Sequence, residues 1–170
     1  IAKGYTSSQI MQIYQDCGVT SGLVNLGGNV QALGCKTDGS KWRVAIQSPD
    51  DTEEYLGILE IEDQAVITSG GYERYFEEDG VTYHHIIDPA IGYPADSGLI
   101  SVTIVSDDGT LADGLSTSLF IMGEEKAAQF WRESSDEFEA IMETSDGELY
   151  VTEGIADSLT TDMDVTVIEK

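Results

Sequence analysis

Basic residues are scarce in this sequence: eight Lys and Arg stand against 32 Asp and Glu, which gives a formal net charge of -24. Such a surface repels the phosphates of nucleic acids and anionic membrane surfaces, and this excludes a polynucleotide partner. The same charge repels a free anionic nucleotide. Any phosphate site therefore needs a divalent cation or a few well-placed basic groups.

Long apolar runs and cysteines are scarce as well. No run is long enough to span a membrane, and no basic segment followed by an apolar stretch opens the sequence, so we expect the chain itself to be soluble. Two cysteines, Cys17 and Cys35, match no metal-binding spacing. They could form one disulfide, but we favour two buried thiols, because free Cys behaves as a small hydrophobe.

What is present predicts one domain with a sizeable core, since 41% of the 170 residues are hydrophobic. Apolar residues at helical spacing predict a first helix over residues 6–17, with Thr6, Ser7 and Ser8 as candidate N-caps and Gly18 as its end. Its apolar face comprises Ile10, Ile13, Tyr14 and Cys17. Further helices are predicted over residues 111–122 and 124–133, the former with Ala112, Leu115, Leu119 and Met122 on one face.

Short apolar or alternating runs separated by Gly and Asp predict strands. These runs are 22–26, 30–36, 41–47, 55–61, 65–69, 99–106, 138–144, 148–153 and 165–168. Residues 72–77 and 81–87 flank Glu78-Asp79-Gly80, which is typical of a hairpin. The order of elements predicts an α+β fold in which a largely antiparallel sheet packs against helices.

Candidate chemistry lies in two segments, HHIIDPAIGYP at 84–94 and LADGLSTSLFIMG at 111–123. Asp113 and Thr117 are four residues apart, hence on one face of the predicted helix. One carboxylate and one hydroxyl suit magnesium, which completes its coordination with water and substrate phosphates. The alternative is that Asp113 lies near a helix start and only stabilises the helix dipole.

Both histidines, His84 and His85, end a predicted strand, so their side chains point to opposite faces. One imidazole beside a metal-bound phosphate could act as a general base for a hydroxyl nucleophile. A structural histidine bonded beneath the turn is the alternative. The prolines after Asp88 and Tyr93 predict a stiff loop that could hold a ligand.

Two glycine pairs follow predicted strands. NLGGN at 25–29 allows positive φ or close approach of another group, although a simple turn explains it equally well. TSGG at 68–71 could present backbone N–H groups to an anion such as pyrophosphate.

Several motifs together resemble, in order and spacing, the ApbE-type FAD:protein FMN transferases. They are IAKGY at 1–5, NLGGN at 25–29, ITSGGYERYF at 67–76, HHIIDPAIGYP at 84–94 and LADGLSTSLFIMG at 111–123. The resemblance implies a magnesium-dependent enzyme of the ApbE-like fold. Its reaction cleaves FAD at the pyrophosphate, attaches FMN to a threonine hydroxyl of a target protein and releases AMP.

Carried over to this sequence, the resemblance assigns the metal to Asp113 and Thr117, with Ser116 as a further candidate. It assigns FAD contact to Lys3, catalysis to His85 and the lining of the flavin nucleotide site to Ile87. The remaining candidates for binding FAD are Gly27, Gly28, Ser69, Gly70, His85 and Asp88.

The sequence departs from the family pattern at Ala90 and Ile91, where a basic residue and a threonine are usual, and more mildly at Gly71. The resemblance also leads us to expect that residues 1–170 are the C-terminal portion of the catalytic domain. A preceding half, with a lipid anchor that holds the protein outside the cytoplasm, would then lie upstream. Three alternatives stay open: an FAD pyrophosphatase that gives FMN and AMP, a flavin- and metal-binding domain without transferase activity, and an acidic structural module.

Overall fold

A seven-stranded sheet runs through the middle of the computed structural model, which describes residues 1–49, 54–72, 74–78, 80–134 and 137–170. In spatial order its strands are β1 (Gly22–Leu26), β2 (Asn29–Leu33), β5 (Ala65–Gly70), β10 (Leu99–Ser106), β11 (Glu139–Thr144), β12 (Leu149–Thr152) and β14 (Val165–Ile168). Every neighbouring pair is antiparallel except β12 and β14. This confirms the predicted α+β class and its largely antiparallel sheet.

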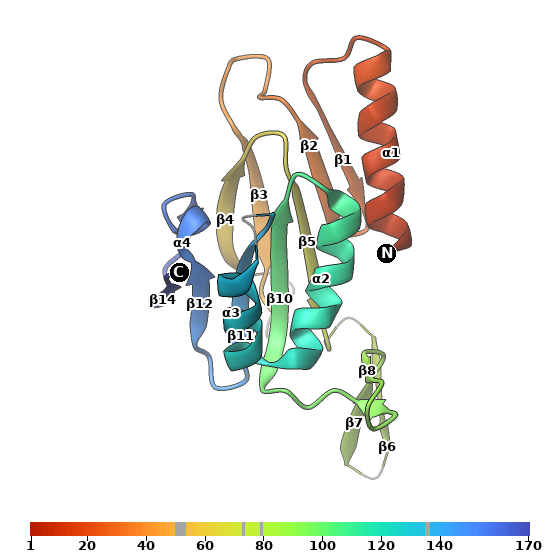
Figure 1. Ribbon diagram of the computed structural model, residues 1–170, viewed down its shortest axis with the longest axis vertical. Coiled ribbons are helices and arrows are strands. Elements are labelled where there is room, and N and C mark those ends of the chain that lie inside the picture. The colour runs from red at the N-terminus through yellow and green to blue at the C-terminus, as the bar shows by residue number, and fades with distance from the viewer. Residues whose placement is uncertain (50–53, 73, 79, 135–136) are drawn as a thin grey trace.

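Each face of this sheet is covered by a different layer (Figure 1). The helices α1 (Ala2–Asp16), α2 (Gly109–Met122) and α3 (Glu124–Glu133) cover one face. On the other face lies a smaller sheet of β3 (Trp42–Gln47), β4 (Tyr55–Ile61) and β13 (Leu159–Thr160), with the short helix α4 (Glu153–Ala156) nearby. Successive residues of a strand point to opposite faces of the main sheet: Ile104 packs under the helices and Val105 packs between the two sheets.

Helix α1 begins at Ala2, four residues earlier than predicted, and the predicted capping by Thr6, Ser7 and Ser8 is wrong. Its buried face comprises Gly4, Ser7 and Met11, whereas Ile13 is 57% exposed. Cys17 is also exposed and Cys35 is half-buried, so the two cysteines are free thiols but not buried ones. The predicted apolar face was therefore wrong at two of its positions.

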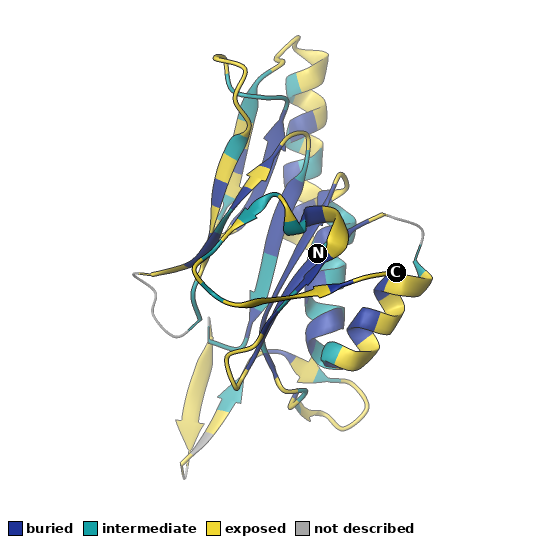
Figure 2. Ribbon diagram, turned by 90° about the vertical axis from the view of Figure 1, so that its left-hand side faces the viewer, coloured by how far each residue is buried: buried dark blue, intermediate teal, exposed yellow. Residues whose placement is uncertain are grey.

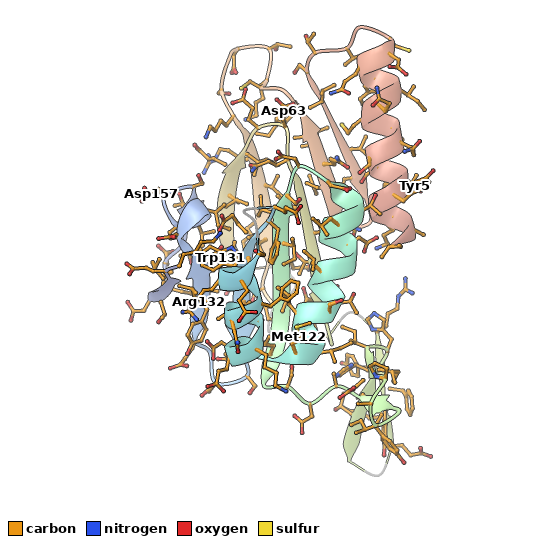
Figure 3. The ribbon with its side chains drawn as sticks, in the orientation of Figure 1. Tyr5, Asp63, Met122, Trp131, Arg132 and Asp157 are labelled. Atoms are coloured by element: carbon orange, nitrogen blue, oxygen red, sulfur yellow. The ribbon has the colours of Figure 1, made fainter. Side chains whose placement is uncertain are left out.

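Helix α2 begins two residues before its predicted start, because the Asp108 side chain accepts hydrogen bonds from the first turn. Its buried side includes Ala112 and Leu119 as predicted, together with Phe120. Met122, labelled at the end of α2 in Figure 3, is 37% exposed and does not belong to that side. In α3, which has its predicted bounds, the indole of Trp131 is buried and donates to the Phe138 carbonyl at 3.1 Å.

Four short strands form an arm that projects from one end of the main sheet (Figures 1 and 2). They are β6 (Tyr75–Glu78), β7 (Val81–His84), β8 (Ile87–Asp88) and β9 (Tyr93–Pro94). Strands β6 and β7 form the predicted hairpin, although Asp79 of its turn lies outside the described residues. The predicted stiff loop after Asp88 is itself a small hairpin of β8 and β9.

None of the described helices combines the length and apolar character that crossing a bilayer requires.

Candidate functional site

Segments far apart in the sequence meet at the first turn of α1. The Lys3 Nζ donates to the Gly27 carbonyl at 2.9 Å, which ties α1 to the turn between β1 and β2. The backbone N–H of Gly4 donates to Oδ2 of Asp113 at 2.8 Å, which ties α1 to α2. Three of the predicted site residues, Lys3, Gly27 and Asp113, are thus gathered around one helix end.

This meeting depends on a close crossing of two helices at glycines. A Cβ atom on Gly4 would overlap the backbone carbonyl of Gly109 and lie 2.6 Å from the Cβ of Asp113. A Cβ on Gly109 would lie 2.6 Å from Oε1 of Gln31. Because both residues lack a side chain, α1 can approach α2 closely enough for the Gly4 backbone N–H to reach Asp113.

Asp113 stabilises the start of a helix, but not of its own helix. Asp108 caps α2, whereas Asp113 accepts from the N–H of Gly4, the third residue of α1, whose N-cap Ile1 supplies no side-chain bond. The nitrogen of Ile1 also lies 3.6 Å from Oδ2 of Asp113. Asp113 thus lies near a helix start, as the alternative to a metal ligand supposed, but that helix is α1 and not α2.

A chain of hydroxyl groups continues from Asp113 to the end of β5. The Ser116 hydroxyl donates to the Asp113 carbonyl at 3.1 Å, and Ser69 Oγ lies 2.8 Å from Ser116 Oγ and 3.1 Å from Thr117 Oγ1. Each hydroxyl has one proton, so Ser69 must donate to Ser116 and Thr117 must donate to Ser69. This order leaves the lone pairs of Thr117 free to accept.

The oxygen atoms around Asp113 are of the kind that binds a hard divalent cation. Its side chain is 17% exposed, and within the described residues no hydrogen bond is made to its Oδ1. The described part of the chain has no group of three or more His, Cys, Asp or Glu that could hold a metal. A cation here would depend on one carboxylate oxygen, neutral oxygens and water, which is how magnesium is usually held.

The two glycine pairs differ in conformation. Gly27 and Gly28 have φ values of 61° and 92°, and the Gly28 N–H donates to the Asn25 side chain at 2.9 Å. Ser69 and Gly70 instead lie in β5 and pair with Val102 and Ser101 of β10. The backbone anion site at Ser69 and Gly70 stays a prediction, and the structure adds that the Ser69 hydroxyl faces α2.

The two histidines are bonded differently, and His85 lies just beyond the end of β7. His84 Nδ1 accepts from the Ile86 N–H at 3.3 Å, so its Nε2 donates to the Ala95 carbonyl at 3.0 Å. Its ring meets Phe120 of α2 edge-on with a centroid distance of 5.7 Å. His84 thus has the structural role that was the alternative for this pair.

His85 is exposed on the arm, and its Nδ1 lies 3.3 Å from the Arg74 carbonyl. If Nδ1 donates there, Nε2 is the unprotonated nitrogen and can accept a proton. In the described residues, no hydrogen bond connects His85 with Asp113, Thr117 or Lys3. The structure therefore does not bring the predicted catalytic residue into contact with the predicted metal ligands.

The other candidates on the arm are Ile87, which is exposed, and Asp88, whose Oδ1 accepts from the Ala90 N–H at 2.8 Å. A cavity of about 440 Å³ opens between the arm and the end of α2. Its lining includes Gly71, Tyr72, His84 and Phe120.

Sequence reasoning missed Asn29, the last residue of the NLGGN motif. Its side chain is 4% exposed, and its Nδ2 has no hydrogen-bond partner among the described residues. A buried amide without a partner is uncommon in folded proteins. The only signal in the sequence was a polar residue placed directly after a glycine turn.

Comparison with known proteins identifies the family. Residues 1–142 match the family model described as the ApbE family. The chain is 42% identical over 142 residues to an FAD:protein FMN transferase of Treponema pallidum, with 78% of this chain and 39% of the relative covered. It is 40% identical over 153 residues to one of Klebsiella pneumoniae, with 89% and 46% covered.

Solved structures agree with this comparison. The ApbE protein of Thermotoga maritima superimposes with a TM-score of 0.82 at 36% identity and covers 91% of this chain and 50% of that one. The flavin transferase ApbE of Vibrio cholerae gives a TM-score of 0.75 at 35% identity and covers 89% and 48%. The chain thus spans about half the length of these relatives. On the family match, these identities and these superpositions, the chain belongs to the ApbE family.

Proposed function

We propose that this chain carries the cation- and pyrophosphate-binding part of an enzyme that transfers FMN from FAD to a threonine hydroxyl of an acceptor protein and releases AMP. The proposal is supported by the names of the relatives, which are FAD:protein FMN transferases. The observation that carries it is the meeting of Lys3 and Asp113 at the first turn of α1, with the hydroxyl groups of Ser116, Ser69 and Thr117 continuing from Asp113.

Asp113 and Thr117 would hold magnesium, with Oδ1 of Asp113 and the free lone pairs of Thr117 as the protein ligands. When bound, magnesium neutralises negative charge on the pyrophosphate oxygens. Ser116 is fully buried and its proton is donated to the Asp113 carbonyl, so we assign it the role of orienting Ser69. Gly4 orients the carboxylate of Asp113 in the same way, through its backbone N–H.

Lys3 and the N-terminal end of α1 would bind the anionic oxygens of FAD. The Lys3 ammonium is exposed and is held beside the turn at Gly27, which leaves two of its three N–H donors for a ligand. The dipole of α1 adds positive potential at the same end. In a chain with a net charge of -24, this local concentration of donors offsets the general repulsion of a dinucleotide.

His85 would accept the proton of the acceptor threonine through Nε2. The threonine oxygen then forms a bond to the phosphorus of the FMN half, and the bond from that phosphorus to the bridging oxygen breaks. The electron pair of the broken bond leaves with AMP, so atoms and charge balance. Because His85 lies on the arm, this step requires the pyrophosphate to extend from α1 toward the arm.

The experiment is to incubate the chain with FAD, magnesium and a protein that carries a candidate threonine, and then to weigh the acceptor. A mass increase of one FMN group, absent when the cation is chelated and absent with Thr117→Val, is the expected result. Release of FMN and AMP with an unchanged acceptor would instead identify an FAD pyrophosphatase. Binding of FAD without either product would identify a binding domain, and both results contradict the proposal.

We also propose that the whole protein works outside the cytoplasm and is anchored there by a lipid on a segment that precedes these residues. The support is the family resemblance. Fractionation of cells that express the full-length protein tests this, and recovery of all of it in the cytoplasmic fraction would refute it.

A further inference from the structure

Asn29 lies at the start of β2, where its side chain faces the helices. Its neighbours Val30 and Ala32 pack between the two sheets, so alternation along the strand turns Asn29 and Gln31 toward α1 and α2. Gln31 has this orientation, because its Oε1 accepts from the Ser7 hydroxyl of α1 at 2.7 Å. Asn29 therefore lies on the covered face of the sheet, beneath the helices.

The position of Asn29 along that face is fixed by its neighbours in β2. Gln31 lies level with Ser7 of α1, and Gly27 lies level with Lys3, so Asn29 falls between these two levels. Across the sheet, Val30 pairs with Val66 of β5, so one residue further along each strand Asn29 is level with Ile67, two residues before Ser69. Asn29 is thus beside the first turn of α1, where Asp113, Lys3 and the hydroxyl chain meet.

Two neighbouring buried amides in β2 differ in their bonding. Gln31 is 5% exposed and is bonded to α1, whereas Asn29 is 4% exposed and its Nδ2 has no partner among the described residues. A buried donor without an acceptor costs stability and needs an explanation such as an absent ion or ligand. Within the part of the chain that the structure describes, no hydrogen bond of the Nδ2 atom explains why an amide stands there.

We propose that the Asn29 amide binds the nucleotide by donating a hydrogen bond to an anionic phosphate oxygen of FAD. This inference rests on the proposed function and adds a residue to it. The amide has no charge, so it can lie close to Asp113 without an ion pair that would neutralise the carboxylate. Lys3 approaches the same ligand from the exposed side and Asn29 from the buried side.

The test compares Asn29→Leu with the matched control Gln31→Leu, using the magnesium-loaded chain titrated with FAD and with inorganic pyrophosphate. Asn29→Leu is expected to weaken binding of both probes by about 10- to 100-fold, the range for a hydrogen bond to a charged group. Its Tm should be unchanged or higher, because an unpartnered donor is removed. Gln31→Leu should show the reverse: a lower Tm, because the hydrogen bond between β2 and α1 is lost, and unchanged affinity.

Asn29→Ala shows whether the larger leucine side chain disturbs the packing. It should weaken the binding of FAD and of pyrophosphate to a similar extent as Asn29→Leu. Asn29→Asp separates an anion-binding amide from a metal ligand. If the amide binds phosphate, the added charge should weaken pyrophosphate binding further than alanine does. Tighter binding of Mn²⁺ by Asn29→Asp with unchanged FAD affinity would overturn the inference.

Equal FAD affinity of Asn29→Ala and the unsubstituted chain would also overturn it and leave the proposed function standing. If the unsubstituted chain binds neither FAD nor pyrophosphate, the proposed function fails and this inference fails with it.

Discussion

The cluster at the first turn of α1 and the arm are built in opposite ways. The cluster joins residues that are far apart in the sequence, such as Gly4 and Asp113, and most of its groups are buried or half-buried. The arm is made of short hairpins, and all four residues of β6 are exposed. Groups proposed to bind cation and phosphate are thus set by the core, whereas the proposed base, His85, is set by local bonds on a projection.

Of the two histidines, His84 rather than His85 anchors the arm to the rest of the fold. The ring of His84 packs against Phe120 and donates to the Ala95 carbonyl, and the Ala95 N–H donates to the Ile86 carbonyl at 3.0 Å. Gly71 also lies against this ring, because a Cβ there would be 3.0 Å from it. Two neighbouring histidines thus have different surroundings, and we propose that only His85 takes part in the chemistry.

The largest expected effect is at Asp113. Asp113→Ala should abolish cation-dependent transfer and also lower the free energy of unfolding by about 1 kcal/mol, because the N–H of Gly4 loses its acceptor. Asp113→Asn keeps an acceptor oxygen and should keep stability while losing most cation affinity. Calorimetric titration with Mg²⁺ and urea unfolding measure the two effects. Equal cation affinity in Asp113→Asn and the unsubstituted chain would remove Asp113 from the metal site.

The histidine pair comes next. His85→Ala should lower the rate of transfer by about 10²- to 10⁴-fold, the usual contribution of a general base, without changing Tm. His84→Ala should instead lower the free energy of unfolding by about 1–3 kcal/mol, through loss of its bonds and of packing on Phe120. Single-turnover rates and thermal unfolding are measured for both variants: the rate should fall in His85→Ala and the Tm should fall in His84→Ala. If His84→Ala slows transfer as much as His85→Ala while keeping its Tm, the division of roles is wrong.

The helix crossing gives a smaller effect, and it is confined to the cluster. Gly4→Ala should lower the free energy of unfolding by about 1–3 kcal/mol, because its Cβ overlaps the Gly109 carbonyl. Gly114→Ala on α2 is the matched control: its Cβ meets only Ile1 at 3.5 Å, so it should stabilise the helix by about 0.5–1 kcal/mol. Chemical denaturation measures both. Equal stability of the two variants would show that α1 does not pack as described.

Lys3 should give the smallest effect. Lys3→Met removes an exposed ammonium and its hydrogen bond to the Gly27 carbonyl. The free energy of unfolding should therefore change by less than about 0.5 kcal/mol. FAD affinity should fall by about tenfold and become less sensitive to salt, because one charge contact is lost. Titrations at two ionic strengths test this. An unchanged salt dependence would place Lys3 outside the ligand site.

Local patterns in the sequence were sufficient to predict most strands and helices. Strand β10 and helix α3 have their predicted bounds, because alternation and helical periodicity are properties of neighbouring residues. The start of α1 could not be found in this way, since the acceptor for its Gly4 N–H is Asp113, 109 residues away. The family resemblance singled out Asp113, Thr117 and Lys3; the fold brings Lys3 and Asp113 to the start of α1, and Thr117 reaches Ser69 of β5.

Other features needed the tertiary structure. The strands β8 and β9 hold only two residues each, too few for a periodic pattern. The donor order through Ser69 and Ser116 depends on where β5 lies relative to α2, and no spacing in the sequence encodes that. Asn29 was missed because an unpartnered donor can be recognised only when its surroundings are known.

The crossing of α1 and α2 at Gly4 and Gly109 also has a consequence for protein engineering. Libraries meant to change the nucleotide preference would ordinarily vary the groups that touch the ligand, and they could do so while the scaffold survives. Neither glycine has a side chain that could bind a ligand, yet a larger residue at Gly4 would overlap the Gly109 carbonyl and push α1 away from Asp113. Both positions should therefore be held constant in any such library, because they set the distance between α1 and α2.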